Sequence, residues 1–203
     1  MKKDVARLNR LISMILRISG LEERKGIADF QIYDADQVLE SIINEAKENY
    51  TLHDEQILVK GTTAQKCVLD IDAFSVAFAN LVDNAIKYSV DGAQIEIEIA
   101  NNKKFISIEF SDCGVGIPSK EQKKVFQKFY RGQSQNSPSV KGTGLGLFWA
   151  KEILKYHGGN IFIVKSDSSG TTFRIELPIY KEDKSRKLNK LLRIAKENRN
   201  RKK

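Results

Sequence analysis

A ladder of polar side chains interrupts an otherwise apolar helical pattern in the stretch NLVDNAIKYS. Asn80 and Asn84 are four residues apart, and Lys87 and Tyr88 continue the same stripe. The apolar residues of this stretch recur at helical spacing, which predicts a helix with one buried side. Asparagine is a poor helix former and is costly to bury without partners, so the polar side needs an explanation.

The residue types of the ladder suit a metal-bound triphosphate. Amide oxygens such as those of Asn80 and Asn84 can ligate or orient hydrated magnesium, and the ammonium group of Lys87 can offset phosphate charge. The alternative is that these residues form the solvated side of an amphipathic helix. The stretch taken alone favours that alternative, so two glycine-rich loops elsewhere in the chain decide between the two interpretations.

The first loop is DCGVGI, which begins at Asp112. Gly114 and Gly116 allow positive φ and a close approach of the backbone to a ligand. Asp112 directly follows a predicted strand, so the sheet would fix its carboxylate, which can accept a hydrogen bond from a ligand amine. A structural turn explains most such loops when they occur singly.

The second loop is KGTGLGL, in which Gly142, Gly144 and Gly146 precede a predicted helix. Free backbone N–H groups and the positive end of a helix make such a loop a natural anion site. The loop is neither a Walker loop, which needs Gly-Lys-Ser/Thr together, nor a dinucleotide fingerprint after a strand. Three sets of nucleotide-suited groups in one chain favour a nucleotide site.

The elements that must position these residues mix helices with strands. The pattern predicts a helix over 36–50 with Asp36 as its N-cap, a helix from about Asp72, a short helix over 120–130 and a helix over 145–159. It predicts strands over 56–61, 65–71, 160–166 and 171–179, and a hairpin over 94–112 that turns at NNKK. We therefore expect an α+β fold: a two-layer sandwich with a mixed, largely antiparallel sheet covered by helices on one face, preceded by one long helix.

That long helix is predicted over residues 4–19, which carry a heptad seam of apolar residues and stop near Gly20. The seam packs either on its own domain or on another helix hairpin or chain. We divide the chain into residues 1–24 with the helix and a hinge, a central domain over 25–180, and a basic tail over 181–203.

Composition limits the class of protein. The net charge of +8 over 203 residues comes from the tail, which holds eleven Lys or Arg and three Asp or Glu. The remaining body is neutral, which argues against a nucleic-acid surface. Only Cys67 and Cys113 are present, and no apolar run approaches a membrane span, so we expect a domain in a reducing, cytoplasmic compartment.

The tail itself has apolar residues at helical spacing, at Leu188, Leu191, Leu192 and Ala195. One interpretation is an amphipathic basic helix that contacts an acidic surface, either an anionic membrane or an acidic protein. The other is a disordered, solubilising tail.

Five motifs in order carry a family resemblance: NLVDNAIKYS, DCGVGI, VFQKFYR, KGTGLGL and GTTFRIELP. With this order and spacing the chain, over roughly 30–180, resembles the ATP-binding domain of bacterial sensor histidine kinases. That domain is shared with type II topoisomerases, heat-shock ATPase chaperones and mismatch-repair ATPases, and the FQKFYR box favours the kinase branch. Residues 4–24 resemble the second helix of the kinase dimerisation and phosphotransfer hairpin.

The resemblance implies a site for ATP and Mg²⁺ and a role for each motif residue. Asn84 would be the main magnesium-organising residue with Asn80 helping, and Lys87 and Tyr88 would lie along the phosphates. Asp112 would bind the adenine amino group, and Gly114 and Gly116 would make room for the base. A mobile lid over 132–141 would begin at Tyr130 and Arg131, and Arg131 would reach the γ-phosphate. The glycines of the second loop, Gly142, Gly144 and Gly146, would close over the phosphates. Thr171 of the last box would also line the nucleotide.

A histidine kinase also needs an acceptor histidine on the first helix of its hairpin. The chain has two histidines, and neither fits: His53 lies in a predicted turn inside the ATP domain, and His157 lies at a helix end next to terminal carbonyls. We therefore expect the C-terminal part of a larger kinase whose acceptor histidine is on a hairpin outside this chain. The resemblance implies a parent protein anchored in the inner membrane, homodimeric through the N-terminal helix, with a response regulator as partner.

Two other functions compete with this interpretation. One is a different ATPase of the same superfamily that uses hydrolysis for conformational work, although nothing like a transducer domain follows here. The other is a degenerate domain that serves as an ATP-binding or dimerisation module, against which the intact Asn84, Asp112 and both glycine loops argue.

Overall fold

The computed structural model describes residues 29–132, 142–182 and 186–200. The predicted long helix over 4–19 and most of the predicted lid lie outside these residues. The strands are β1 (Gln31–Asp34), β2 (Ile57–Lys60), β3 (Lys66–Leu69), β4 (Ile95–Asn101), β5 (Phe105–Asp112), β6 (Asn160–Asp167) and β7 (Gly170–Pro178). The helices are α2 (Ala35–Tyr50), the 3₁₀ turn η1 (Asp54–Gln56), α3 (Ile71–Tyr88), α4 (Gly146–Tyr156) and α5 (Arg186–Asn200).

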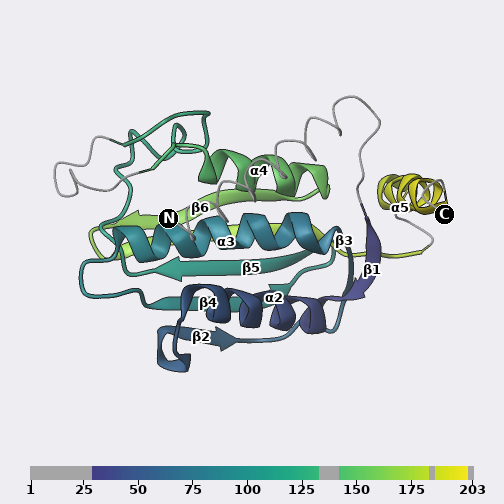
Figure 1. The fold of residues 1–203 in the computed structure, drawn as a ribbon, viewed down its shortest axis with the longest axis horizontal. Coiled ribbons are helices and arrows are strands. Elements are labelled where there is room, and N and C mark those ends of the chain that lie inside the picture. The colour runs from purple at the N-terminus through teal and green to yellow at the C-terminus, as the bar shows by residue number, and fades with distance from the viewer. Residues whose placement is uncertain (1–28, 133–141, 183–185, 201–203) are drawn as a thin grey trace.

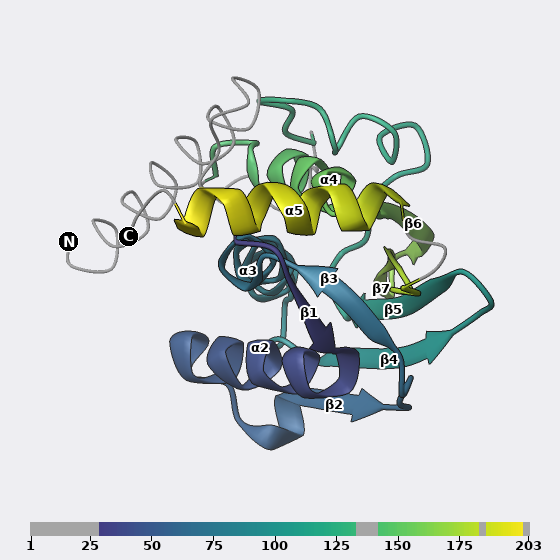
Figure 2. The ribbon, with the colours of Figure 1, turned by 90° about the vertical axis from the view of Figure 1, so that its right-hand side faces the viewer.

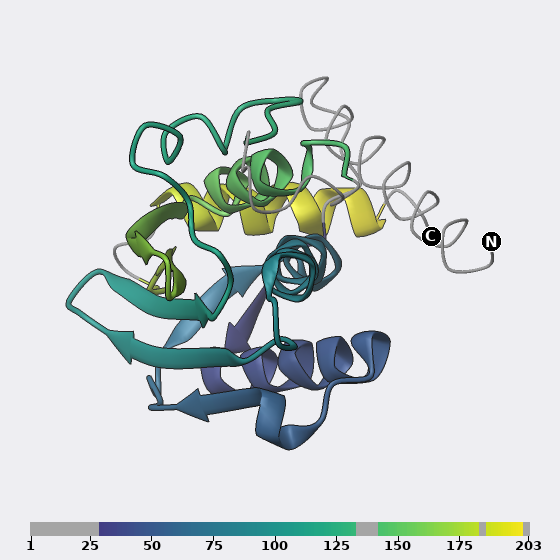
Figure 3. The same ribbon diagram turned by 90° about the vertical axis from the view of Figure 1, so that its left-hand side faces the viewer.

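The strands form a five-stranded sheet in the order β2-β4-β5-β7-β6 and a small sheet of β1 and β3. Only the β2–β4 pair of the large sheet is parallel. Helices α2, α3 and α4 lie together on one face of the large sheet (Figures 1 and 3). The predicted α+β sandwich, with a mixed and largely antiparallel sheet, is therefore confirmed.

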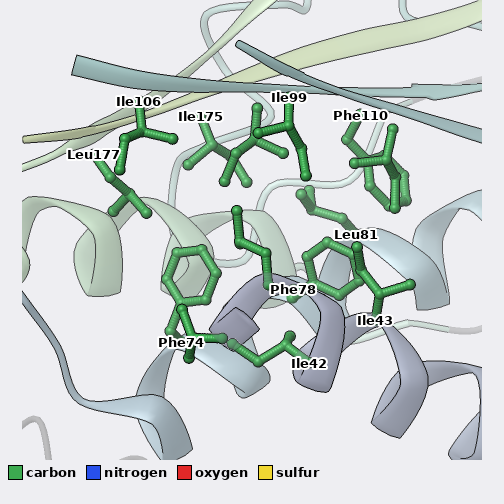
Figure 4. Packing of buried hydrophobic residues seen from close by; sticks show 14 of the residues in the cluster. Ile42, Ile43, Phe74, Phe78, Leu81, Ile99, Ile106, Phe110, Ile175 and Leu177 are labelled. Carbon is green, nitrogen blue, oxygen red and sulfur yellow. The ribbon is translucent and has the colours of Figure 1, made fainter. Parts of the chain in front are cut away.

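The core lies between the large sheet and these helices, and α3 runs through its centre. The alternation in β5 points Ile106, Ile108 and Phe110 toward the helices, and all three are fully buried. Phe78 of α3 meets Phe110 edge to face at 5.7 Å between ring centroids. Figure 4 shows Ile106 and Phe110 of the sheet facing Phe78 of α3. This packing holds α3 in place and leaves its other side for the polar ladder.

At the start of the domain, one local prediction is wrong and one strand was missed. The N-cap of α2 is Asp34, whose side chain accepts from the backbone N–H of Gln37. Asp36 lies inside the first turn instead, and its carboxylate accepts the backbone N–H groups of Thr63 and Ala64 at 2.9 Å each. Strand β1, which precedes the cap, is not among the predicted strands.

The segment predicted as a helix over 120–130 forms a series of turns instead. Lys124 and Gln127 donate their N–H groups to carbonyl oxygens three residues earlier, at Glu121 and Lys124. The N–H of Val125 makes one four-residue bond, to Glu121 O at 3.0 Å, but no run of such bonds follows it within this segment, as an α-helix would require. Phe129 ends the segment with a positive φ of 62°, which a helix excludes.

The tail forms the basic amphipathic helix α5, so the alternative of a disordered tail is wrong for residues 186–200. Its apolar side faces the domain: Leu188 and Ala195 are buried against Phe30 and Val68. Figure 2 shows α5 lying across the end of the molecule where β1 begins. Among the described residues, no helix has the length and apolarity needed to cross a membrane.

Candidate nucleotide-binding site

Asp112 ends β5 directly opposite Thr171 of β7 in the sheet register. Its Oδ1 accepts the backbone N–H of Gly114 at 2.8 Å and that of Thr171 at 3.3 Å. Its Oδ2 makes no hydrogen bond with any residue of the described ranges. Burial raises the pKa of this carboxyl and the two backbone hydrogen bonds oppose the rise. The result is a fixed, partly desolvated acceptor with one oxygen available to a ligand donor.

The loop after Asp112 is pressed against α3 and the β6–β7 turn. The N–H of Val115 donates to Tyr88 O at 3.1 Å. Gly116 has a φ of 72°, and a Cβ there would lie 1.9 Å from Asp167 O. Only glycine satisfies both conditions, so this loop keeps a side-chain-free path beside Asp112.

Thr171 supports Asp112 from the neighbouring strand. Its side chain is buried, with Oγ1 2.9 Å from Ser166 Oγ, and Ser166 Oγ also accepts the N–H of Ile117 at 2.7 Å. Together with the hydrogen bond from its N–H to Asp112, these contacts make Thr171 a support of the loop and of the carboxylate. A direct contact of Thr171 with nucleotide stays a prediction.

The amide ladder lies on the side of α3 that faces the start of α4. Asn80 donates through Nδ2 to Val76 O at 3.0 Å, and a Cβ added to Gly146 would lie 3.0 Å from Asn80 Oδ1. The side chain of Asn84 is half-buried, and its amide makes no hydrogen bond with any other described residue. A half-buried amide without a partner is costly unless a ligand pairs with it, so Asn84 is the strongest candidate on this helix.

Lys87 has a partner that the sequence analysis missed. It forms an ion pair with Asp83, one turn earlier on α3, and the two side chains are 22% and 20% exposed. The i, i+4 spacing of these residues was a readable signal. In this structure Lys87 therefore lies along its own helix, while Tyr88 is exposed at the helix end.

The second glycine loop lies against the end of the turn segment that holds Phe129 and Tyr130. Gly144 has a φ of 68°, and a Cβ there would lie 2.7 Å from both Phe129 C and Tyr130 O. Gly146 is the first residue of α4, and Gly142 is exposed. The loop thus approaches the helix start through backbone alone, as an anion site requires.

Tyr130 is held by Glu121, a carboxylate that the sequence analysis did not single out. Burial raises the pKa of Tyr130, and the Glu121 charge and its hydrogen bond to the phenol raise it further. Glu121 is 8% exposed, and its Oε2 lies 2.5 Å from where a Cβ of Gly132 would be. The burial of Glu121 had no signal in the sequence. Arg131 is exposed beside this group.

The geometry joins the predicted motifs along one helix. The stretch of α3 from Asn80 to Tyr88 touches Gly146 at one end and the Asp112 loop at the other. A ligand amine bound at Asp112 and an anion bound at the second glycine loop, before α4, would therefore be separated by the length of the amide ladder. This arrangement fits a nucleoside triphosphate laid along α3.

Comparisons with known proteins identify the family of this domain. Residues 69–181, more than half of the chain, match the profile of the family described as histidine kinase-, DNA gyrase B-, and HSP90-like ATPase. The chain is 30% identical over 187 residues to the sensor-like histidine kinase SenX3 of Mycolicibacterium smegmatis, which covers 91% of this chain and 49% of that protein. It is 29% identical over 184 residues to the sensor histidine kinase WalK of Bacillus subtilis, with 90% and 30% covered.

Solved structures share the fold. The Acinetobacter baumannii histidine kinase AdeS aligns with a TM-score of 0.64 at 21% identity, covering 87% of this chain and 81% of that one. The mycobacterial sensor histidine kinase MprB aligns with a TM-score of 0.58 at 24% identity, covering 73% and 97%.

The fold is that of the ATP-binding catalytic domain of histidine kinases. The chain belongs to the histidine kinase-, DNA gyrase B-, and HSP90-like ATPase family, and it spans half or less of the length of the curated sensor kinases named above.

Proposed function

We propose that this chain is the catalytic part of a sensor histidine kinase, which transfers the γ-phosphoryl group of Mg-ATP to a histidine carried on another segment or chain. The observation that carries the proposal is that Asp112 and Asn84, at two places along the candidate site, each present a polar group without a described partner. One offers a fixed acceptor with a free oxygen, and the other offers an unpaired amide on the helix that joins the two glycine loops.

The residues present fit ATP and Mg²⁺. The free Oδ2 of Asp112 matches the amino donor of adenine, and the loop with Gly114 and Gly116 leaves space beside it. Asn84, supported by Asn80, would hold magnesium, whose chemistry is to offset charge on the triphosphate. The start of α4 would bind phosphate through its free N–H groups.

Catalysis of phosphoryl transfer depends mostly on positioning the reactants and stabilising charge on the phosphates. The remaining motif residues would therefore orient the triphosphate. Lys87 would exchange its contact with Asp83 for phosphate, and Arg131 would reach the γ-phosphate. Tyr130, held by Glu121, would fix the start of the lid. These roles are proposals for the bound state.

The nucleophile is proposed to come from outside the described domain. His157 is fully buried, with its Nδ1 2.7 Å from Ile153 O and its Nε2 accepting the N–H of Asp70 at 3.1 Å. His53 is exposed, but it caps η1 between α2 and β2. An acceptor hairpin would supply the histidine, and a response regulator would receive the phosphoryl group from it.

The test combines binding and transfer. Calorimetry should show tighter ATP binding with magnesium than without it, and the Asn84→Ala variant should lose that difference while Asn44→Ala, an exposed amide on α2, keeps it. With labelled ATP the chain alone should stay unlabelled, and a separate acceptor hairpin should gain label. Acid-labile phosphate on the chain alone would contradict the proposal.

A further inference from the structure

His157 lies where three parts of the domain meet, at the end of α4 that is remote from the glycine loop. Both of its ring nitrogens bind backbone groups: Nδ1 pairs with Ile153 O in the last turn of α4, and Nε2 accepts the N–H of Asp70. This pattern requires a neutral ring with the proton on Nδ1. The side chain therefore joins the end of α4 to the residue that caps α3.

Asp70 extends this junction to the start of the domain. Its Oδ1 accepts the N–H of Ala73, which caps α3, and its Oδ2 accepts the N–H of Asp29, both at 3.1 Å. One residue thus binds α3 through its side chain, α4 through its backbone, and the incoming chain through its second oxygen. A shift of any one of the three would strain the other two.

Aromatic packing closes the junction around the imidazole. The ring of His157 lies edge to face with Phe30 at 5.1 Å and with Phe74 at 6.0 Å between centroids, and Phe30 contacts Tyr156 at 4.9 Å. Phe30 is 1% exposed, and α5 covers it with Leu188. The junction is buried and close-packed, so it behaves as one rigid unit.

The two helices joined at His157, α3 and α4, carry the candidate nucleotide-binding groups at positions remote from this junction. From His157, α4 runs back about 16 Å to Gly146, where a Cβ would lie 3.0 Å from Asn80 Oδ1. The hydrogen bond from the Asp70 N–H to Nε2 and the ring contacts with Phe30 and Phe74 fix this end of α4 to the cap of α3. They thereby set the tilt at which the other end of α4 presents the glycine loop to the amides of α3.

We propose that His157 is a positioning residue for the nucleotide site. It fixes the end of α4 to the cap of α3 and to the incoming chain at Asp29 and Phe30, and through α4 it holds the glycine loop against the amide ladder. The proposal rests on the proposed function, since it concerns the same ATP site. It adds a residue that keeps the glycine loop and the amide ladder of that site in a fixed relative position.

Two variants separate the two hydrogen bonds of the ring. The amide of an asparagine side chain falls near the position of Nδ1, so His157→Asn keeps the bond to Ile153 O and leaves the Asp70 N–H unpaired. The amide of a glutamine falls near Nε2, so His157→Gln keeps an acceptor for Asp70. His53→Asn, a change at the exposed histidine, is the matched control.

We expect His157→Asn to weaken Mg-ATP binding by about two- to tenfold, the worth of one hydrogen bond. His157→Gln and His53→Asn should bind within about twofold of the unchanged chain. Affinities are measured by calorimetry well below the melting temperature of each variant, so that loss of folded protein does not contribute.

Hydrogen exchange gives a second readout that local packing alone would not move. In His157→Asn, without nucleotide, the amides of the segment 143–147 should exchange faster, together with that of Asp70. Unchanged exchange at 143–147, or equal Mg-ATP affinity in all folded variants, would overturn the proposal. Failure of the unchanged chain to bind Mg-ATP would instead overturn the proposed function, and the exchange measurement would still decide the role of His157.

Discussion

One oxygen of the Asp112 carboxylate, Oδ1, accepts the N–H of Gly114 at 2.8 Å and holds the side chain in place for its second oxygen to meet a ligand. An asparagine at this position can keep its carbonyl oxygen on the same backbone N–H groups. Its NH₂ group would then occupy the place of Oδ2 and donate where the carboxylate accepts.

The first prediction concerns how Asp112 discriminates between adenine and guanine nucleotides. Asp112→Asn should weaken ATP binding by about tenfold to a hundredfold, since a hydrogen bond to a charged group contributes about 1.5–3 kcal/mol. GTP, which carries a carbonyl in place of the adenine amino group, should bind the unchanged protein poorly and lose less in the variant. Competition of both nucleotides against a fluorescent ATP analogue measures this ratio.

A matched control for this change is Asp54→Asn, because Asp54 is a 93% exposed carboxylate outside the site. It should leave both affinities unchanged. Equal affinity of the unchanged protein for ATP and GTP would remove Asp112 from base recognition.

The second prediction concerns the glycine loop without nucleotide. Gly144→Ala must place a Cβ 2.7 Å from two backbone atoms at a positive φ, so it should lower the free energy of unfolding by about 1–2 kcal/mol. Gly142→Ala adds a Cβ that meets no described atom within 4 Å and should change it by less than about 0.5 kcal/mol. Urea unfolding compares the two; equal stabilities would show that the loop does not depend on this close approach.

Short-range patterns in the sequence predicted much of this domain. Strict alternation predicted the β4–β5 hairpin, and the period of the apolar residues predicted α3 with one polar side. The glycine loops identified both ends of the candidate site because glycine is needed where backbone approaches backbone, as at Gly116 and Gly144.

Features that depend on distant contacts could not be predicted in this way. The burial of Glu121 follows from how the turn segment folds back, and nothing in its neighbours indicates that course. The apolar spacing of α5 predicted a helix, but its contact with Phe30 joins residues from opposite ends of the chain. Asp34 and Asp36 are both good caps, and the strand pairing of β1 with β3 decides between them.

The third prediction tests the docking of α5. Leu188 is buried against Phe30, so Leu188→Ala should lower the free energy of unfolding by about 2 kcal/mol or more. Ile194, 36% exposed on the same helix, is the matched control, and Ile194→Ala should cost less than about 0.5 kcal/mol. Both are measured by urea unfolding, and similar effects of the two changes would mean that α5 does not pack on the domain in solution.

The same packing bears on the predicted contact of the tail with an anionic membrane or acidic protein. The apolar side of α5 is used within the domain, which leaves the basic side, with Lys190, Arg193 and Lys196, for any such contact. Binding to anionic vesicles should therefore be purely electrostatic and disappear with added salt. Vesicle binding that persists in high salt would show that α5 leaves the domain and inserts.

The last prediction is a pH dependence of stability that arises from His157. Burial lowers the pKa of this imidazole below its ordinary value of 6.5, while the hydrogen bond to Ile153 O and the Asp70 charge oppose the shift. Of the titratable groups packed around the ring, Asp70 and Tyr156 face it. The folded state therefore keeps His157 neutral where the unfolded chain already binds a proton.

The sign of the effect follows from this difference. The stabilisation by neutral His157 is complete above pH 6.5 and is lost as the pH falls from 6.5 toward the lower pKa of the folded state. Within that window the free energy of unfolding should fall by up to about 1.4 kcal/mol per pH unit.

Urea unfolding at about pH 7.5 and about pH 5.5 should show this loss. His157→Gln, which cannot titrate, should lose less stability between the two values, and His53→Gln, at the exposed histidine, should behave like the unchanged protein. The carboxyl groups contribute equally to all three proteins, so the difference between them isolates His157. If His157→Gln loses as much stability as the unchanged protein, then another group causes the loss. The neutral imidazole with both nitrogens hydrogen-bonded would then not be the source of the pH dependence.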